Sequence, residues 1–226
     1  TDGNLFNVFR KAGYHTVSIS TFAERHSSYW FYAGFNEMYN VGKGGMESAE
    51  EVTPVALKWL EDNAETDKWF LHYHLWDPHT PYRTPDAFGN PFAEVPLADN
   101  WIDEKTFAEH YQHIGPHNPQ EINMWDDQVD PEYPKHPGRL DTLQDVKKFI
   151  DGYDCGVRFA DDNVAQLIQV LKQKGVYEDT AIIITSDHGE NLGELGIYGE
   201  HATADEMCCH IPMIVKWPGV PAGSVE

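Results

Sequence analysis

Three segments of the sequence carry side chains that can bind a cation or transfer a proton, and each lies after a predicted strand. In the first, Asp187 and His188 follow the apolar run 181–184 within Ser-Asp-His-Gly-Glu. A carboxylate oxygen next to an imidazole nitrogen suits a divalent cation. The alternative is a turn in which Asp187 caps the following residues and His188 is a solvated loop residue. The other motifs favour the cation-binding interpretation.

The second segment is Asp-Pro-His-Thr-Pro-Tyr at 77–82, and the third is the glycine-rich segment 193–201. Prolines close to His79 on both sides restrict its loop and favour a fixed pose for the imidazole. The third segment ends in Glu200 and His201. Since imidazoles exchange protons near neutral pH, His79 and His201 are candidate catalytic residues.

The elements that must position these segments alternate between strands and helices. Apolar periodicity predicts helices over 5–12, 50–63 and 145–174, and strands over 15–20, 69–75, 212–217 and from 181 onward. This order predicts an α/β fold with a mainly parallel sheet flanked by helices, in which the strand from 181 is buried on both faces. Ligands of such sheets bind at the carboxyl edge. We therefore expect four side chains to converge there: His79, Asp187, His188 and His201.

Composition and charge restrict the class of partner. The 226 residues favour one domain, and 41% hydrophobic residues are typical of a globular chain. The net charge of −21 argues against nucleic acid and anionic membranes as partners, because phosphate contacts need Lys and Arg. No apolar run is long enough to span a bilayer. Three cysteines, two of them adjacent, predict neither a disulfide framework nor a cysteine metal site.

The stretch 83–143 has no clear period and is too long for an ordinary connection. We interpret it as a long irregular insertion over the carboxyl edge, where segments that contact substrates belong. Its aromatic residues can stack on sugar rings or pack within the loop: Phe88, Phe92, Trp101, Tyr111 and Trp125.

Together and in this order, the three motifs resemble the catalytic domain of a sulfatase, in the alkaline phosphatase superfamily, over about 5–219. The resemblance implies that Asp187 and His188 hold the divalent cation, usually calcium. It implies that His79 contacts the sulfate and that His201 lies where a basic residue faces the leaving oxygen. A sulfate ester needs its oxygens neutralised and its alkoxide protonated, which a cation and imidazoles can supply.

The sequence departs from the family pattern at several positions. Many relatives carry Lys where Glu200 stands, and His where Leu195 stands. Others carry Gly-Lys-Trp-His after the first strand, where Arg25 and His26 occur here. These two residues are candidate substrate-binding residues, with a solvated loop as the alternative.

The formylglycine motif Cys/Ser-x-Pro/Ala-x-Arg is absent from the sequence. We therefore expect residues 1–226 to be a partial, truncated sulfatase catalytic domain that lacks the nucleophile and the carboxyl-terminal subdomain. Such a fragment would be inactive alone, would bind its cation weakly or not at all, and could dimerise through the truncated apolar face.

Three functions remain open on the sequence. The first is hydrolysis of a small-molecule or carbohydrate sulfate ester by the full-length protein. The second is a two-metal phosphodiester or phosphonate hydrolase of the same superfamily, with zinc or manganese held by the Asp-His pair and with Asp77, His79 and His201 as further ligands. The third is a non-catalytic binding module with the same fold.

Overall fold

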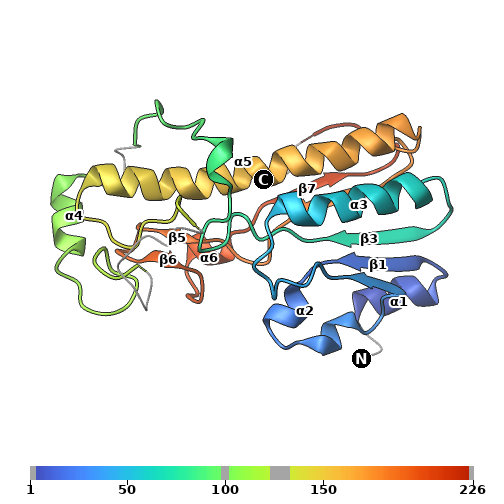
Figure 1. Ribbon diagram of the computed structural model, residues 1–226, viewed down its shortest axis with the longest axis horizontal. Helices are drawn as coiled ribbons and strands as arrows, with labels where there is room; N and C mark the ends of the chain where they lie inside the picture. The colour runs from blue at the N-terminus through green and yellow to red at the C-terminus, as the bar shows by residue number, and fades with distance from the viewer. Residues whose placement is uncertain (1–3, 98–101, 123–132, 224–226) are drawn as a thin grey trace. The chain divides into compact units, whose positions relative to one another are not determined.

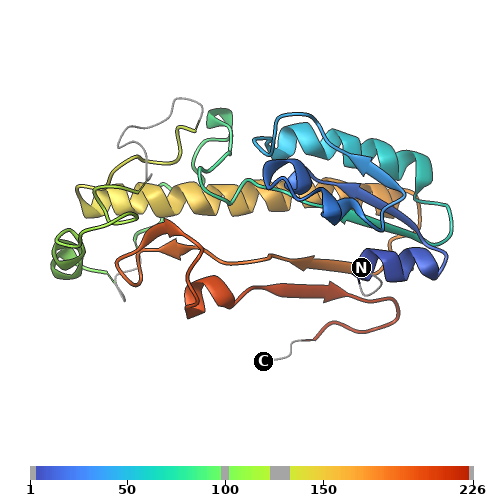
Figure 2. The ribbon, with the colours of Figure 1, turned by 90° about the horizontal axis from the view of Figure 1, so that it is seen from below.

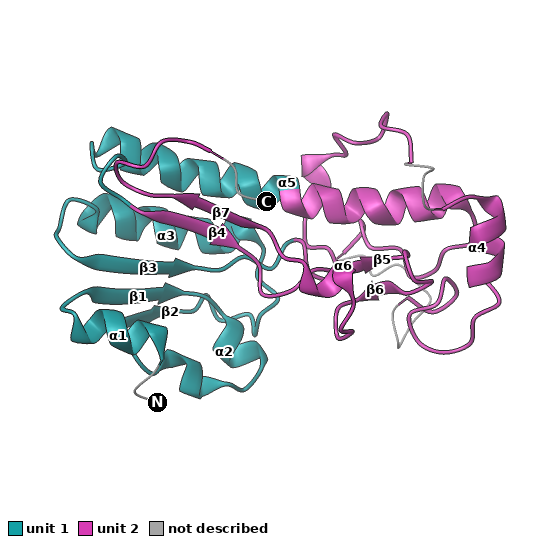
Figure 3. Ribbon diagram, turned by 180° about the vertical axis from the view of Figure 1, so that it is seen from behind, with its two compact units in different colours: residues 1–77, 158–180 teal, residues 78–157, 181–226 magenta. Residues whose placement is uncertain are grey.

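The structure is a computed structural model that describes residues 4–97, 102–122 and 133–223 (Figure 1). Contacts divide the chain into two compact units, residues 1–77 with 158–180 and residues 78–157 with 181–226 (Figure 3). The long helix α5 (Leu143–Gln173) contributes its last part to the first unit and its first part to the second. The prediction of one partial catalytic domain over 1–226 stays a prediction.

The first unit contains a parallel sheet in the order β2-β1-β3. Strand β1 (His15–Ile19) is central, with β2 (Glu37–Tyr39) and β3 (Trp69–Tyr73) in parallel register on either side. Four of the five β1 residues are buried, as expected for a central strand with helices packed against it. The helices of this unit are α1 (Leu5–Lys11), α2 (Phe22–Arg25), the 3-10 helix η1 (Tyr29–Tyr32) and α3 (Ala49–Asn63). This arrangement confirms the predicted α/β class.

The start of α3 is tied to the chain that follows β3. Within the first unit, both carboxylate oxygens of the buried Asp77 accept from the backbone N–H of Ala49, at 3.1 and 3.0 Å. A carboxylate is favourable there because the first amides of a helix lack partners and carry partial positive charge. The side chain of Glu51 accepts from the amide of Ser48 at 3.1 Å, which completes the cap of this helix.

The core of the second unit is built around the first part of α5. A cluster of buried side chains forms this core: Tyr82, Ile102, Phe107, Ile122, Leu140, Val146, Phe149 and Tyr198. Half of these residues come from the stretch 83–143, which also contains the 3-10 helix η2 (Asp86–Phe88) and α4 (Glu104–His110). The described part of this stretch is therefore packed into a core of its own unit. Phe88, Phe92 and Tyr111 are half-buried, whereas Trp101 and Trp125 lie outside the described residues.

The second unit also holds two antiparallel pairs of strands. β4 (Ile182–Thr185) pairs with β7 (Met213–Lys216), and Figure 2 shows these two strands side by side in opposite directions. β5 (Asn191–Leu192) pairs with β6 (Tyr198–Glu200), and the short helix α6 (Glu206–Cys209) follows. Both strands predicted at 181 and 212–217 are thus confirmed.

The prediction that the strand from 181 is buried on both faces is wrong for the part of the chain that the structure describes. Residues of β4 alternate between half-buried and exposed, and Ile183 is 55% exposed. An apolar run shows only that the side chains of the strand are nonpolar. Their burial also needs a layer of other side chains against each face of the strand. Ile214 on β7 is 62% exposed, so an apolar face is present. Dimerisation through it stays a prediction.

Among the described helices, none is both long and apolar enough to cross a bilayer.

We expect the substitution Gly152→Ala to destabilise the protein, although alanine is the better helix former by about 1 kcal/mol. A β-carbon at position 152 of α5 would lie 2.2 Å from the carbonyl oxygen of Lys135 and 2.8 Å from the ring of Tyr82. Since one of these atoms is backbone, the overlap should lower the melting temperature by about 2 to 8 °C. Gly223→Ala, where no atom lies within 4 Å, is the matched control. A higher melting temperature for Gly152→Ala would contradict this packing.

Candidate functional site

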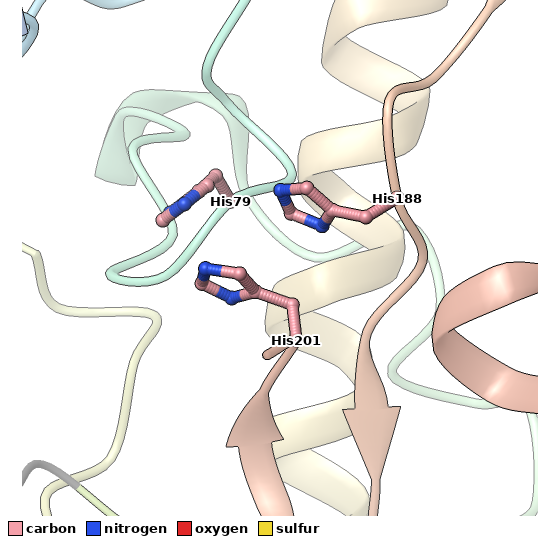
Figure 4. A group of neighbouring side chains, drawn as sticks. All are labelled: His79, His188 and His201. Carbon is pink, nitrogen blue, oxygen red and sulfur yellow. The ribbon is translucent and has the colours of Figure 1, made fainter. Parts of the chain in front are cut away.

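Three histidines from three separate segments of the second unit meet at one point (Figure 4). One ligand atom of each of His79, His188 and His201 lies within 4.8 Å of the others, and all three residues are half-buried. The rings of His188 and His201 are stacked, with centroids 4.3 Å apart and planes at 13°. The ring of His79 lies 4.6 Å from that of His201 and 5.7 Å from that of His188.

Backbone carbonyls select the nitrogen that two of these rings present. Nδ1 of His79 lies 2.5 Å from the carbonyl oxygen of Thr80, and Nδ1 of His188 lies 2.8 Å from that of Gly189. A carbonyl oxygen can only accept, so each Nδ1 carries the hydrogen and the neutral ring keeps its lone pair on Nε2. Metal-binding histidines are commonly oriented in this way, with one nitrogen donating to a carbonyl and the other free to coordinate.

The segments that carry His79 and His188 are fixed by neighbouring residues. The guanidinium of Arg83 donates to the carbonyl oxygens of His79 at 3.1 Å and Pro81 at 3.2 Å, which fixes the loop around the first ring. Gly189 follows His188 and packs directly on α6, since a β-carbon there would lie 1.9 Å from the carbonyl oxygen of Met207. Only glycine therefore fits after His188 without moving this helix.

Asp187 lies beside the three rings. Its Oδ1 is 3.8 Å from Nε2 of His188, and its side chain is 63% exposed. Donor atoms about 2.0–2.2 Å from a shared metal ion lie about 3.3–3.6 Å apart at a tetrahedral angle, so these two side chains would need a small approach to share an ion. The donor atoms that lie together are three imidazole nitrogens, which fit a divalent cation of the zinc class, and the Asp187 carboxylate adjoins one of them.

The protonation of His201 suits this arrangement. Burial, and then the neighbouring His188, lowers the pKa of its ring from the usual 6.5. The ring is therefore neutral at neutral pH and keeps one lone pair. Its Nδ1 is buried and has no hydrogen-bond partner among the residues that the structure describes.

Arg25 and His26, the candidate substrate-binding residues, lie in the first unit around Trp76. The guanidinium of Arg25 is 5.1 Å from the centre of the Trp76 ring and donates to the sulfur of Met46 at 3.2 Å. The exposed ring of His26 lies 5.6 Å from that of Trp76. These contacts bring the two residues to one aromatic side chain, and their role in binding stays a prediction.

Sequence reasoning missed two residues close to the site. Glu190 is 8% exposed, and burial followed by the charge of Glu200 raises its pKa to about 8. His117, from the stretch 83–143, forms an ion pair with Glu200 at 2.8 Å. The position of Glu190 directly after the Asp-His-Gly motif was a signal that could have marked it. The aperiodic segment around His117 offered none.

Comparison with known proteins identifies the family of this chain. A family model for sulfatases matches residues 1–225. The chain belongs to the sulfatase family. A choline-sulfatase of Rhizobium meliloti (strain 1021) is 23% identical over 205 residues, which are 86% of this chain and 37% of that protein. This sulfatase-family chain therefore spans well under half the length of that relative.

Solved structures share the fold. The structure of BT4656 in complex with its substrate D-glucosamine-2-N,6-O-disulfate has a TM-score of 0.63 at 18% identity, and the match covers 94% of this chain and 55% of that one. Phosphonate monoester hydrolase SpPMH from Silicibacter pomeroyi has a TM-score of 0.61 at 19% identity, with coverage of 95% and 52%. The sulfatase-type α/β fold expected from the sequence is thus confirmed, and the family is one of hydrolases.

We expect Glu190→Gln to stabilise the protein more at pH 8 than at pH 5. Because the folded-state pKa is raised from 4.5 to about 8, the favourable contribution of the buried neutral acid is complete below pH 4.5 and is lost as the pH rises to 8. The gain from the permanently neutral amide should grow by about 1.4 kcal/mol for each pH unit in that window. Thermal unfolding across this range measures it. Glu206→Gln, at an exposed position, is the control, and an equal shift at both pH values would contradict the buried neutral acid.

Proposed function

We propose that this chain supplies part of the active site of a hydrolase that cleaves a sulfate ester of a small molecule or carbohydrate. The observation that carries the proposal is the convergence of His79, His188 and His201, with Asp187 beside them. Membership of the sulfatase family and the similarity to a choline-sulfatase support the same reaction. The chain is acidic, with a net charge of −21, so an anionic ester needs a local cation or imidazole donors.

The residues of the site fit a divalent cation. Asp187 Oδ1 and His188 Nε2 would hold it, since these atoms lie 3.8 Å apart and the His188 Nδ1 hydrogen is already donated to a carbonyl. A bound cation neutralises charge on the oxygens of the group that is transferred. The resemblance to sulfatases implies calcium, whereas nitrogen donors favour zinc because calcium prefers oxygen ligands.

His79 and His201 would act on the ester itself when it is bound, whereas without substrate a nitrogen of His201 would serve as a further ligand of the cation. A protonated His79 ring can donate from Nε2 to the sulfate or to the departing alkoxide, since its Nδ1 is bound to Thr80. The neutral His201 ring donates one N–H and keeps one acceptor nitrogen, which suits a hydrogen bond to a sulfate oxygen. Arg25 and His26 remain the proposed substrate-binding residues, with the guanidinium of Arg25 contributing positive charge.

A second candidate function is the hydrolysis of a phosphonate ester or phosphodiester with zinc or manganese. The donor set of three imidazoles favours it, and a phosphonate monoester hydrolase shares the fold. In that reaction His79 and His201 would bind metal. Both carboxylate oxygens of Asp77 accept from the amide of Ala49 in the first unit, and its role as a metal ligand stays a prediction. A non-catalytic binding module is the third possibility.

We expect the full-length gene product to hydrolyse an aryl sulfate faster than an aryl phosphonate monoester. His79→Ala should lower kcat by about 100- to 1,000-fold, because one preorganised donor to the transferred group is lost. The melting temperature should change little, and His210→Ala, at an exposed histidine, should leave both quantities unchanged. Faster phosphonate hydrolysis would favour the second candidate. Hydrolysis of neither ester, with tight binding of both, would favour the binding module.

The sequence predicts weak cation binding by this chain, but the three neighbouring imidazole nitrogens lead us to expect that isothermal titration of the 226 residues shows one zinc ion bound more tightly than calcium. His188→Ala and His201→Ala should each weaken zinc binding by at least about 10-fold, because each removes a ligand. His210→Ala is again the control. Calcium binding that depends on Asp187 and not on His201 would show instead that only the Asp-His pair holds the cation.

A further inference from the structure

Glu200 occupies a position directly before His201 and contacts the backbone on both sides of that residue. Its Oε1 accepts from the amide of His201 at 2.8 Å and from the amide of Ala202 at 2.7 Å. Two consecutive amides bound to one carboxylate oxygen fix the local backbone from which the His201 ring projects. This contact involves only backbone amides, so it fixes the main chain that carries the His201 side chain and does not engage the nitrogens of the ring.

The second oxygen of the same carboxylate is held by a residue from a distant part of the chain. Oε2 of Glu200 lies 2.8 Å from Nε2 of His117, and the two side chains are only 23% and 14% exposed. Nδ1 of His117 lies 3.1 Å from the carbonyl oxygen of Tyr198. Both ring nitrogens of His117 therefore face acceptors, which is the arrangement of a doubly protonated ring and a charge-assisted ion pair.

The backbone around His117 is organised for these contacts. His117 has a φ of 62°, in the left-handed region that side chains other than glycine rarely adopt. Its carbonyl accepts from the amide of Tyr198 at 2.8 Å, and its amide donates to the carbonyl of Glu121 at 2.9 Å. An unfavourable backbone conformation that is held by hydrogen bonds on both sides indicates a functional constraint at that residue.

We propose that His117 and Glu200 are positioning residues that hold His201 in the site. A carboxylate next to His201 would by itself repel an anionic ester. The pair resolves this conflict, because His117 neutralises the carboxylate while the carboxylate anchors His201. The inference rests on the proposed function only in assigning His201 a role at the bound ligand.

The test compares His117→Ala with His117→Gln, which keeps an N–H donor for Glu200. The first measurement is amide hydrogen exchange of the metal-free chain. His117→Ala should speed the exchange of the His201 and Ala202 amides by at least about 10-fold, without affecting the amides of α5, and His117→Gln should restore most of the protection. Unchanged exchange at these two amides would overturn the proposal, as would an equal acceleration throughout α5.

The second measurement is zinc affinity by isothermal titration. His117→Ala should weaken binding by about 10-fold and His117→Gln by less, as for other groups that orient a metal ligand. His210→Ala is the matched control, because His210 also pairs with a glutamate, at 3.1 Å, but at the surface. Faster exchange with unchanged zinc affinity would reduce the pair to a structural role and overturn the proposal. A wild-type chain that binds no zinc would count against the metal centre alone, and amide exchange would then decide the inference.

Discussion

The site depends on a simple constraint, which is that a carbonyl oxygen can accept a hydrogen but never donate one. By engaging Nδ1 of His79 and His188, the carbonyls of Thr80 and Gly189 leave the lone pairs of both rings on Nε2. Burial then keeps His201 neutral. Neutral rings can bring one nitrogen each within 4.8 Å of the others, whereas three imidazolium ions would repel strongly. The segments that carry these rings are held by Arg83, by the packing of Gly189 on α6, and by Glu200.

Much of the fold and all four residues named for the site could be predicted from the sequence. Periodicity located α1, α3 and α5 and the strands β1, β3, β4 and β7, because each has an apolar pattern of its own. The rule that ligands bind after strands then grouped His79, His188 and His201 correctly, with Asp187 beside them. Arg25 and His26, chosen by the resemblance alone, are found together around Trp76, and their function is open.

What the sequence could not predict depends on partners far away in the chain. The short strands β2, β5 and β6 hold their shape by pairing, and two or three residues carry no readable period. β4 pairs antiparallel with β7, a partner about 30 residues away in the chain. Ile183 is exposed because burial depends on the elements packed against the strand and not on the strand's own sequence. The raised pKa of Glu190 and the ion pair of His117 likewise arise from burial and from contacts between residues distant in sequence.

The stretch 83–143 looked like an appendage in the sequence, yet it supplies Ile102, Phe107 and Leu140 to the core of its unit and His117 to the anchor of His201. This dual use limits how substrate preference can diverge or be redesigned. A loop that only decorates a rim can be grafted between relatives as an interchangeable cassette. Here such a transplant would remove part of the hydrophobic core and the counter-ion of Glu200 together. New specificity would therefore have to come from point substitutions at exposed positions of the stretch, with its buried framework retained.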